Sequence, residues 1–136
     1  MLDAPLLVLV DLETTEAAPT GPSLELLTAA RELTGGDVVA LALQPLGEAA
    51  SAALAGAGAT RLLSADLGEA AHLPATAADA VVAAVGAVQP AAVLVVSDYR
   101  GKELAGRAAV VLGSACVSDV TALEAAGTEL RASKLV

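Results

Sequence analysis

The feature that most constrains the fold is a strand–loop–helix–strand unit in the second half of the chain. A continuous apolar run rich in β-branched residues, Ala91–Val96, is typical of a strand buried on both faces of a parallel sheet. The helical pattern that follows, Arg100–Leu112, repeats its apolar residues at the spacing of one helix face and ends at Gly113. A second, shorter strand is expected to end at Ser118 and Asp119. Two strands joined through a helix predict a right-handed crossover within one parallel sheet.

The rest of the 136-residue chain repeats this alternation and predicts a single domain. The expected strands are Pro5–Leu12, Asp37–Leu43, Thr60–Ser64 and a more polar edge strand at Thr128–Val136. The first expected helix is Ser23–Thr34, with Ser23 as its N-cap, and the second is Glu48–Ala55. A third helix is expected to open with a capping box at Thr76 and to end before Pro90.

This pattern predicts an α/β fold: a doubly wound, mostly parallel sheet with helices on both faces. The expected strand order is 3-2-1-4-5, with an antiparallel edge allowed at the C-terminal end. Ligands of such sheets bind where the strand order reverses, which here lies between the first and fourth strands.

Charge and composition exclude several classes of partner. The formal net charge is −9, and phosphate binding needs clustered Lys and Arg, so nucleic acid and anionic membrane are not expected as partners. With no apolar run of the roughly 18–20 residues that span a bilayer and no secretion signal, the sequence predicts a cytoplasmic, bacterial protein that is not membrane-embedded. The single cysteine, Cys116, excludes an intramolecular disulfide and is expected to be a small buried hydrophobe. His72 is expected to be exposed in a polar loop, without a partner for metal binding.

Polar residues follow the first and fourth predicted strands, at the expected switch point. They are Asp11, Glu13, Ser97, Asp98 and Arg100. Two carboxylates near an arginine could perform acid–base chemistry, but an acid at a strand end more often caps the next helix, and that is the interpretation favoured for Asp98. The chain contains neither G-x-G-x-x-G after a strand nor G-x-x-x-x-G-K-[ST], so no phosphate-cradling loop is predicted.

One cluster of positive charge stands out, made by Arg100, Lys102 and Arg107 around Gly101. Structurally it is a solvated helix start. Functionally it could bind an anion at the helix N-terminus or contact a partner subunit. The glycines here faintly resemble those of universal-stress-type nucleotide binders, but their spacing departs from that pattern, and Gly106 is expected to serve helix packing instead.

Two motifs in the same region resemble the α subunit of electron transfer flavoproteins. They are S-D-Y-R-G-K-E-L-A-G-R, from Ser97 to Arg107, and V-S-D-V-T-A-L-E, from Val117 to Glu124. The segments Ser23–Leu33 and Leu46–Ala59 match the same family. The similarity therefore covers nearly the whole chain in the right order.

The resemblance implies the N-terminal domain of such an α subunit, with an adenine-nucleotide-hydrolase-like fold. In that family the α subunit pairs with a β subunit, and the heterodimer carries electrons from dehydrogenases to a membrane-bound quinone oxidoreductase. FAD is bound mainly by the C-terminal domain of α, and the AMP found in many members belongs to β. Residues 1–136 are accordingly expected to be one α/β domain, truncated near its C-terminal end, with the FAD-binding domain absent.

The expected role of this domain is scaffold and subunit interface in an electron carrier, not an enzyme. No catalytic, cofactor-binding or metal-binding residue is predicted on it. The candidate interface or anion-contact residues are Arg100, Gly101, Lys102, Arg107, Ser118 and Asp119. Two alternatives remain: a small adenine-nucleotide-binding module of the universal-stress kind, and a hydrolase that uses Asp11, Asp98 and Arg100.

Overall fold

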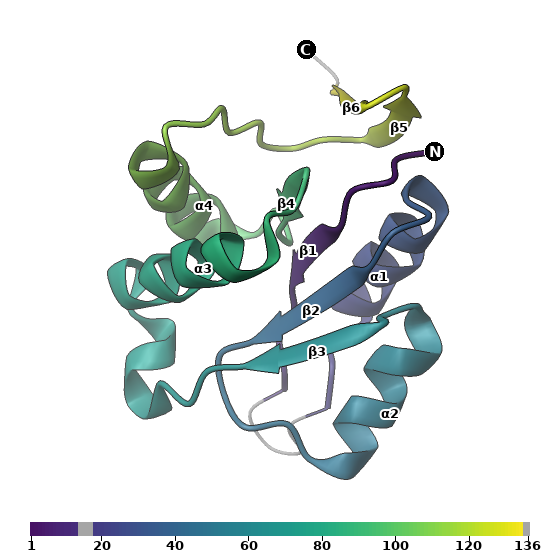
Figure 1. The fold of residues 1–136 in the computed structure, drawn as a ribbon. Coiled ribbons are helices and arrows are strands. Elements are labelled where there is room, and N and C mark those ends of the chain that lie inside the picture. The colour runs from purple at the N-terminus through teal and green to yellow at the C-terminus, as the bar shows by residue number, and fades with distance from the viewer. Residues whose placement is uncertain (14–17, 135–136) are drawn as a thin grey trace.

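A four-stranded parallel sheet forms the centre of the computed structural model, which describes residues 1–13 and 18–134. The strands are β1 (Leu6–Leu9), β2 (Val38–Ala42), β3 (Arg61–Ser64) and β4 (Ala92–Leu94), in the order β3-β2-β1-β4 (Figure 1). Leu7 of β1 lies opposite Val39 of β2 on one side and Val93 of β4 on the other. The predicted α/β class and the parallel sheet are therefore confirmed.

Helices cover both faces of this sheet. One face packs on α1 (Gly21–Leu33) and α2 (Glu48–Ala57), the other on α3 (Pro74–Val88) and α4 (Tyr99–Leu112). Since successive side chains of a strand point to opposite faces, β1 contributes to two separate clusters. Leu6 and Val8 belong to the cluster with α1, whereas Leu7 and Leu9 belong to the cluster with α3 and α4.

Two predicted helix starts are wrong. Thr20, not Ser23, caps α1, because Pro22 in the first turn already has the φ that a helix needs, so the helix begins before Ser23. Ser23 is instead buried inside the first turn, where its Oγ accepts a hydrogen bond of 2.8 Å from the backbone N–H of Asp11. Thr76 caps nothing either, since α3 begins at Pro74, and a short 3₁₀ turn at Gly68–His72 precedes it.

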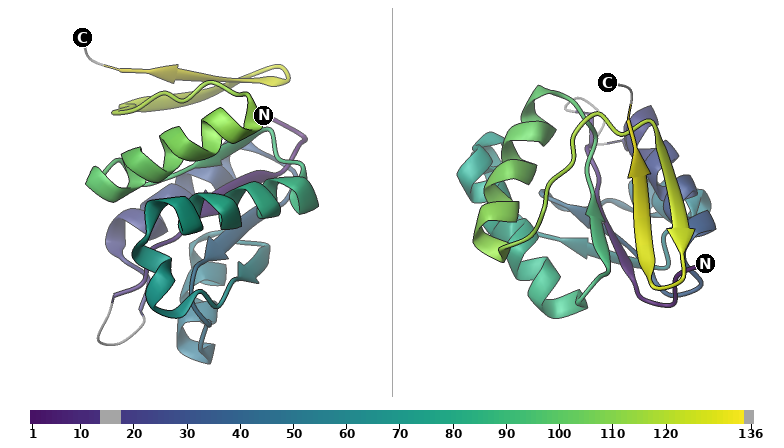
Figure 2. Two further views of the ribbon diagram at one scale, coloured as in Figure 1. Left: turned by 90° about the vertical axis from the view of Figure 1, so that its left-hand side faces the viewer. Right: turned by 90° about the horizontal axis from the view of Figure 1, so that it is seen from above.

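The C-terminal region forms a separate antiparallel hairpin of β5 (Ala122–Ala126) and β6 (Glu129–Ser133). Figure 2 shows the hairpin beside the main sheet, not within it. The predicted antiparallel edge is thus found as an independent pair. Leu123 and Leu130 pack against the core cluster on the α1 side, which is how the hairpin is held on the domain.

Within residues 1–13 and 18–134, the sheet does not contain the fifth strand of the predicted order 3-2-1-4-5. Residues 114–121 between α4 and β5 form no helix or strand. The hairpin pairing begins at the end of this segment, where the backbone N–H of Thr121 donates a hydrogen bond to the backbone oxygen of Ser133. The backbone turns at Gly113 and Asp119, both in the left-handed region with φ of 65° and 56°, and this prevents one continuous extended run.

The missing strand also changes what is buried. Only Leu94 of β4 is buried, Ala91 is exposed, and Val93 and Val95 are only partly buried, so the expectation that Ala91–Val96 is covered on both faces is wrong. Cys116 lies in the irregular segment and is exposed, contrary to the prediction of a buried thiol. The last turn of α4 is also open, with Val111 65 % exposed.

Candidate functional site

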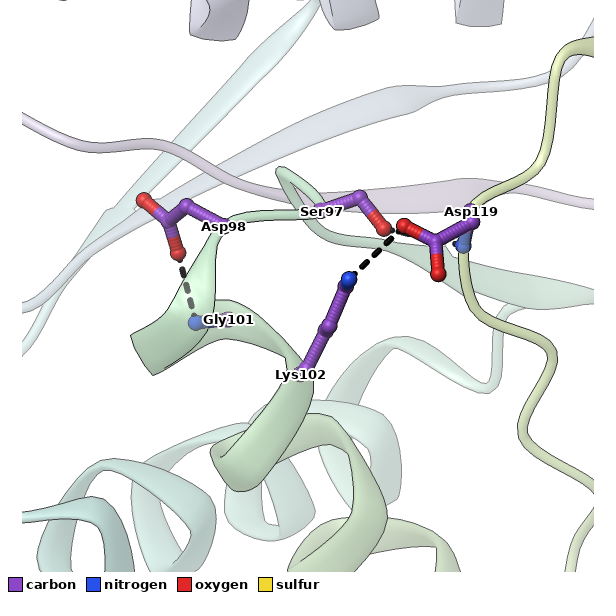
Figure 3. Close-up of polar contacts among 5 residues, drawn as sticks. All are labelled: Ser97, Asp98, Gly101, Lys102 and Asp119. Carbon is purple, nitrogen blue, oxygen red and sulfur yellow. Dashed lines mark hydrogen bonds and ion pairs between the residues drawn. The ribbon is translucent and has the colours of Figure 1, made fainter.

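The N-terminus of α4 lies at the carboxyl end of β4, at the switch point of the sheet. Asp98 is the N-cap residue, and its Oδ1 accepts a hydrogen bond of 2.7 Å from the backbone N–H of Gly101 (Figure 3). A carboxylate in this position satisfies a free N–H group and opposes the positive end of the helix dipole. The interpretation of Asp98 as a capping residue is confirmed.

Gly101 is required for the close packing of α4 on β4. A Cβ atom at this position would lie 2.0 Å from the backbone oxygen of Val96 and 3.1 Å from Cγ1 of Val95. No side chain fits there without moving the strand or the helix, so glycine sets the distance between them. Gly106, by contrast, would have nothing within 4 Å of an added Cβ atom, so the expectation that it serves close helix packing is wrong.

Three residues form a latch between α4 and the irregular segment that follows it. Lys102 Nζ lies 2.8 Å from Asp119 Oδ1, and the backbone N–H of Asp119 donates a 3.0 Å hydrogen bond to Ser97 Oγ (Figure 3). The hydrogen bond and the charge of Lys102 lower the pKa of Asp119 from its usual value. These three residues, the latch hereafter, fix residues 117–120 over the end of β4.

The other candidate residues lie outside the latch. Arg100 is exposed and its Nη2 donates a long hydrogen bond of 3.4 Å to the backbone oxygen of Ala71. Arg107 is further along α4 and pairs with Glu103 at 3.5 Å, as the i,i+4 spacing predicts. Ser118 is half-buried in the segment held by the latch. The structure therefore brings Lys102 and Asp119 into contact, with Gly101 one residue before Lys102, and leaves Arg100 and Arg107 separate.

A cavity of about 570 Å³ opens at the switch point between β1 and β4. Its polar lining includes Asp11, Gln44, His72, Asp98 and Arg100. Burial, and then repulsion by Asp98, raise the pKa of Asp11, while Arg100 lowers it. The net effect is a raised pKa, so burial and Asp98 together affect the pKa of Asp11 more than Arg100 does.

This lining is poorly suited to phosphate. The start of α4, which would otherwise attract an anion, already holds the Asp98 carboxylate, and Asp11 adds a second acid nearby. Lys102 is engaged by Asp119. Within residues 1–13 and 18–134, no group of three or more His, Cys, Asp or Glu residues could hold a metal ion.

Sequence reasoning missed the contact between Ser23 and the loop after β1. Asp11 donates its backbone N–H to Ser23 Oγ, and Thr20 Oγ1 lies 3.0 Å from the same oxygen. This ties the start of α1 to the end of β1 at the switch point. The signal was present as T-G-P-S, in which threonine precedes a proline-containing first turn, a pattern that favours Thr20 as the cap.

Comparison with known proteins gives one family. The model of the electron transfer flavoprotein domain matches residues 8–136. No curated protein matches the chain. Among the described residues, no helix has the length and the hydropathy needed to cross a membrane.

Proposed function

Since the chain belongs to the electron transfer flavoprotein domain family, whose members are electron carriers, we propose that it is the N-terminal domain of an α subunit. In this role it is scaffold and interface: it associates with a homologous β subunit, while FAD is held by a separate C-terminal domain of α and AMP by β. The complete heterodimer then transfers electrons from dehydrogenases to a quinone oxidoreductase. Flavin chemistry supplies the redox step, and these residues help to position the assembly.

The observation that carries the proposal is the family match over residues 8–136, which includes both motifs that resemble the α subunit. The structure adds a physical reason for the residues that these motifs contain. Asp98 and Gly101 fix the start of α4, and Lys102 with Asp119 joins the two motifs to each other. The motif residues thus have structural roles that do not need a bound cofactor.

The test is reconstitution with a homologous β subunit of an electron transfer flavoprotein. The chain is mixed with purified β, and the mass of the product is measured by light scattering after size exclusion. A one-to-one complex is expected, together with no FAD retained by the chain alone in a visible absorption spectrum. Separate elution of the two proteins at micromolar concentration would contradict the assignment to an α subunit.

The switch-point cavity supports a second candidate, an adenine-nucleotide-binding module. Its volume of about 570 Å³ and its place at the strand ends fit such a ligand, but Asp11 and Asp98 oppose the phosphates. Calorimetric titration with ATP and with AMP separates the two proposals. A flat titration eliminates the nucleotide module, whereas saturable binding that Asp11→Lys strengthens would favour it.

A further inference from the structure

α4 presents the two most exposed large hydrophobic side chains among the described residues. They are Tyr99, which is 86 % exposed, and Val110, which is 82 % exposed. Tyr99 is also the only aromatic residue of the sequence. Single exposed hydrophobic residues are ordinary, but these two lie about three turns apart on one face of the helix. Figure 2 shows α4 at the surface of the domain, beside α3, where a second molecule has access to it.

Gly106 lies between them on the same face. At about 100° per residue, Tyr99, Gly106 and Val110 fall within about 40° of one another around the helix axis. We call these three residues the outer face of α4. Glycine inside a helix costs about 1 kcal/mol relative to alanine, yet a Cβ added to Gly106 would meet nothing within 4 Å among the described residues. Packing within the domain therefore gives no reason for this glycine, whereas a second helix that crosses closely at this point does.

One flank of the outer face carries two opposite charges. Glu103 and Arg107 pair at 3.5 Å within the helix, and both side chains are about half-exposed. When two copies of one helix pack antiparallel about a two-fold axis, the same flank of each helix meets its counterpart. With the axis midway between these two charges, Glu103 of each copy faces Arg107 of the other. The same axis places Tyr99 beside Val110 and Val111 of the second copy, so the surface is complementary to itself.

We propose that two copies of this chain associate through the outer faces of their α4 helices, antiparallel about a two-fold axis, with Gly106 at the crossing. This inference does not depend on which subunit of an electron transfer flavoprotein the chain belongs to. α4 has 14 residues and is about 21 Å long, so the contact is smaller than a standard interface of about 800 Å² per partner. The dimer is accordingly weak, and forms at roughly 0.1–1 mM protein.

The first test is sedimentation equilibrium of the full chain and of two glycine variants. Gly106→Gln places a side chain at the crossing and is expected to weaken dimerisation by about ten-fold. The matched control is Gly86→Gln, at an exposed glycine inside α3 where an added Cβ also meets nothing within 4 Å. It should leave dimerisation unchanged. Both variants are expected to unfold at or above the temperature of the parent chain, because glutamine favours a helix more than glycine does.

Two results of this experiment contradict the proposal. One is a parent chain that stays monomeric at 1 mM. The other is a dimer that Gly106→Gln leaves intact, or that both glycine variants weaken equally, since the contact then lies elsewhere on the molecule.

Charge reversal tests the two-fold arrangement. Arg107→Glu places like charges opposite each other at two symmetric positions, and is expected to weaken the dimer by about ten-fold. Adding Glu103→Arg exchanges the two charges within each chain and should restore the affinity of the parent, because each copy again presents opposite charges to the other. Arg61→Glu, at an exposed cation of β3, controls for the change in net charge and should have little effect. A double variant that recovers nothing would rule out the antiparallel pairing.

Other occupants of the outer face are separate outcomes, and each would overturn the proposal. If the chain stays monomeric and a homologous β subunit shifts the amide resonances of residues 99–111, the face belongs to the heterodimer. If the chain dimerises without shifts in these residues, the two copies meet through another surface.

Discussion

β1 and β4 are neighbouring strands of similar apolar composition, yet their surroundings differ. Every residue of β1 is buried, because β2 and β4 flank it and helices cover both faces. Among the residues that the structure describes, β4 has a neighbouring strand on one side only, and of its three residues just Leu94 is buried. An apolar run in the sequence therefore predicts a strand that could be buried. How far the strand is actually buried depends on whether another strand lies on each side of it.

The largest expected effect breaks the well-packed side of this comparison. Leu7→Ala removes a fully buried side chain between β1 and the α3–α4 layer, and should lower the free energy of unfolding by roughly 2–5 kcal/mol. The matched change at the edge, Val93→Ala, should cost only about 1 kcal/mol, because that side chain is smaller and only partly buried. Urea denaturation of both variants measures the difference. Equal losses would show that β4 is as well covered as β1.

The next effect concerns how β4 is attached to α4. Gly101→Ala places a Cβ against the backbone oxygen of Val96 and should destabilise the protein by roughly 1–3 kcal/mol. Gly106→Ala, on the same helix with open space around it, should stabilise by roughly 0.5–1 kcal/mol. Opposite signs in thermal unfolding are the expected result, and a neutral Gly101→Ala would show that the strand and helix can separate freely.

The cap of α4 gives a smaller effect. Asp98→Ala removes the acceptor for the Gly101 N–H and should cost about 1 kcal/mol, whereas Asp98→Asn keeps an acceptor and should recover most of it. Denaturant titration of the two variants distinguishes a cap from a surface charge. If both variants behave like the parent protein, the carboxylate does not support the helix start.

The smallest expected effect depends on pH. The raised pKa of Asp11 means that its charged form is disfavoured in the folded state. This group therefore opposes folding above its folded pKa and ceases to do so below its unfolded pKa of about 4. Asp11→Asn should therefore stabilise the protein slightly at neutral pH, and the gain should vanish as the pH falls through this range. A gain that grows on acidification would contradict the assigned cause.

The latch has the opposite sign. Since Lys102 lowers the pKa of Asp119, the contact stabilises the folded state above the unfolded pKa of the carboxyl and is lost as the pH falls through its lower, folded pKa. Asp119→Asn should increase hydrogen exchange in residues 114–121 without changing exchange in β2. Unaltered exchange in that segment would show that the latch does not hold it.

Much of the fold follows from sequence, and the errors share a physical cause. The strands β1, β2 and β3, the four α-helices and the capping role of Asp98 are predictable because each rests on local periodicity or a local hydrogen bond. The prediction of a fifth strand fails because its pairing is not local: a short run such as Ala115–Val117 suits a strand or an irregular segment equally, and the left-handed Asp119 decides the outcome. The prediction of a buried Cys116 fails for the same reason.

The site was predictable in part. The motif residues Gly101, Lys102 and Asp119 are selected by the family resemblance. The contact between Lys102 and Asp119 could not have been predicted from sequence spacing, because the two residues are 17 positions apart (119 − 102). The grooves on the two faces of β4 could not have been found from sequence, because they depend on where α1 and α4 lie relative to that strand.

Hydrogen exchange of the isolated chain, read residue by residue, tests the difference between β4 and the central strands most directly. The outward amides of residues 92–96 should exchange much faster than those of Val38–Ala42 in β2, which are paired on both sides. Equal protection of the two strands would contradict the open edge of β4.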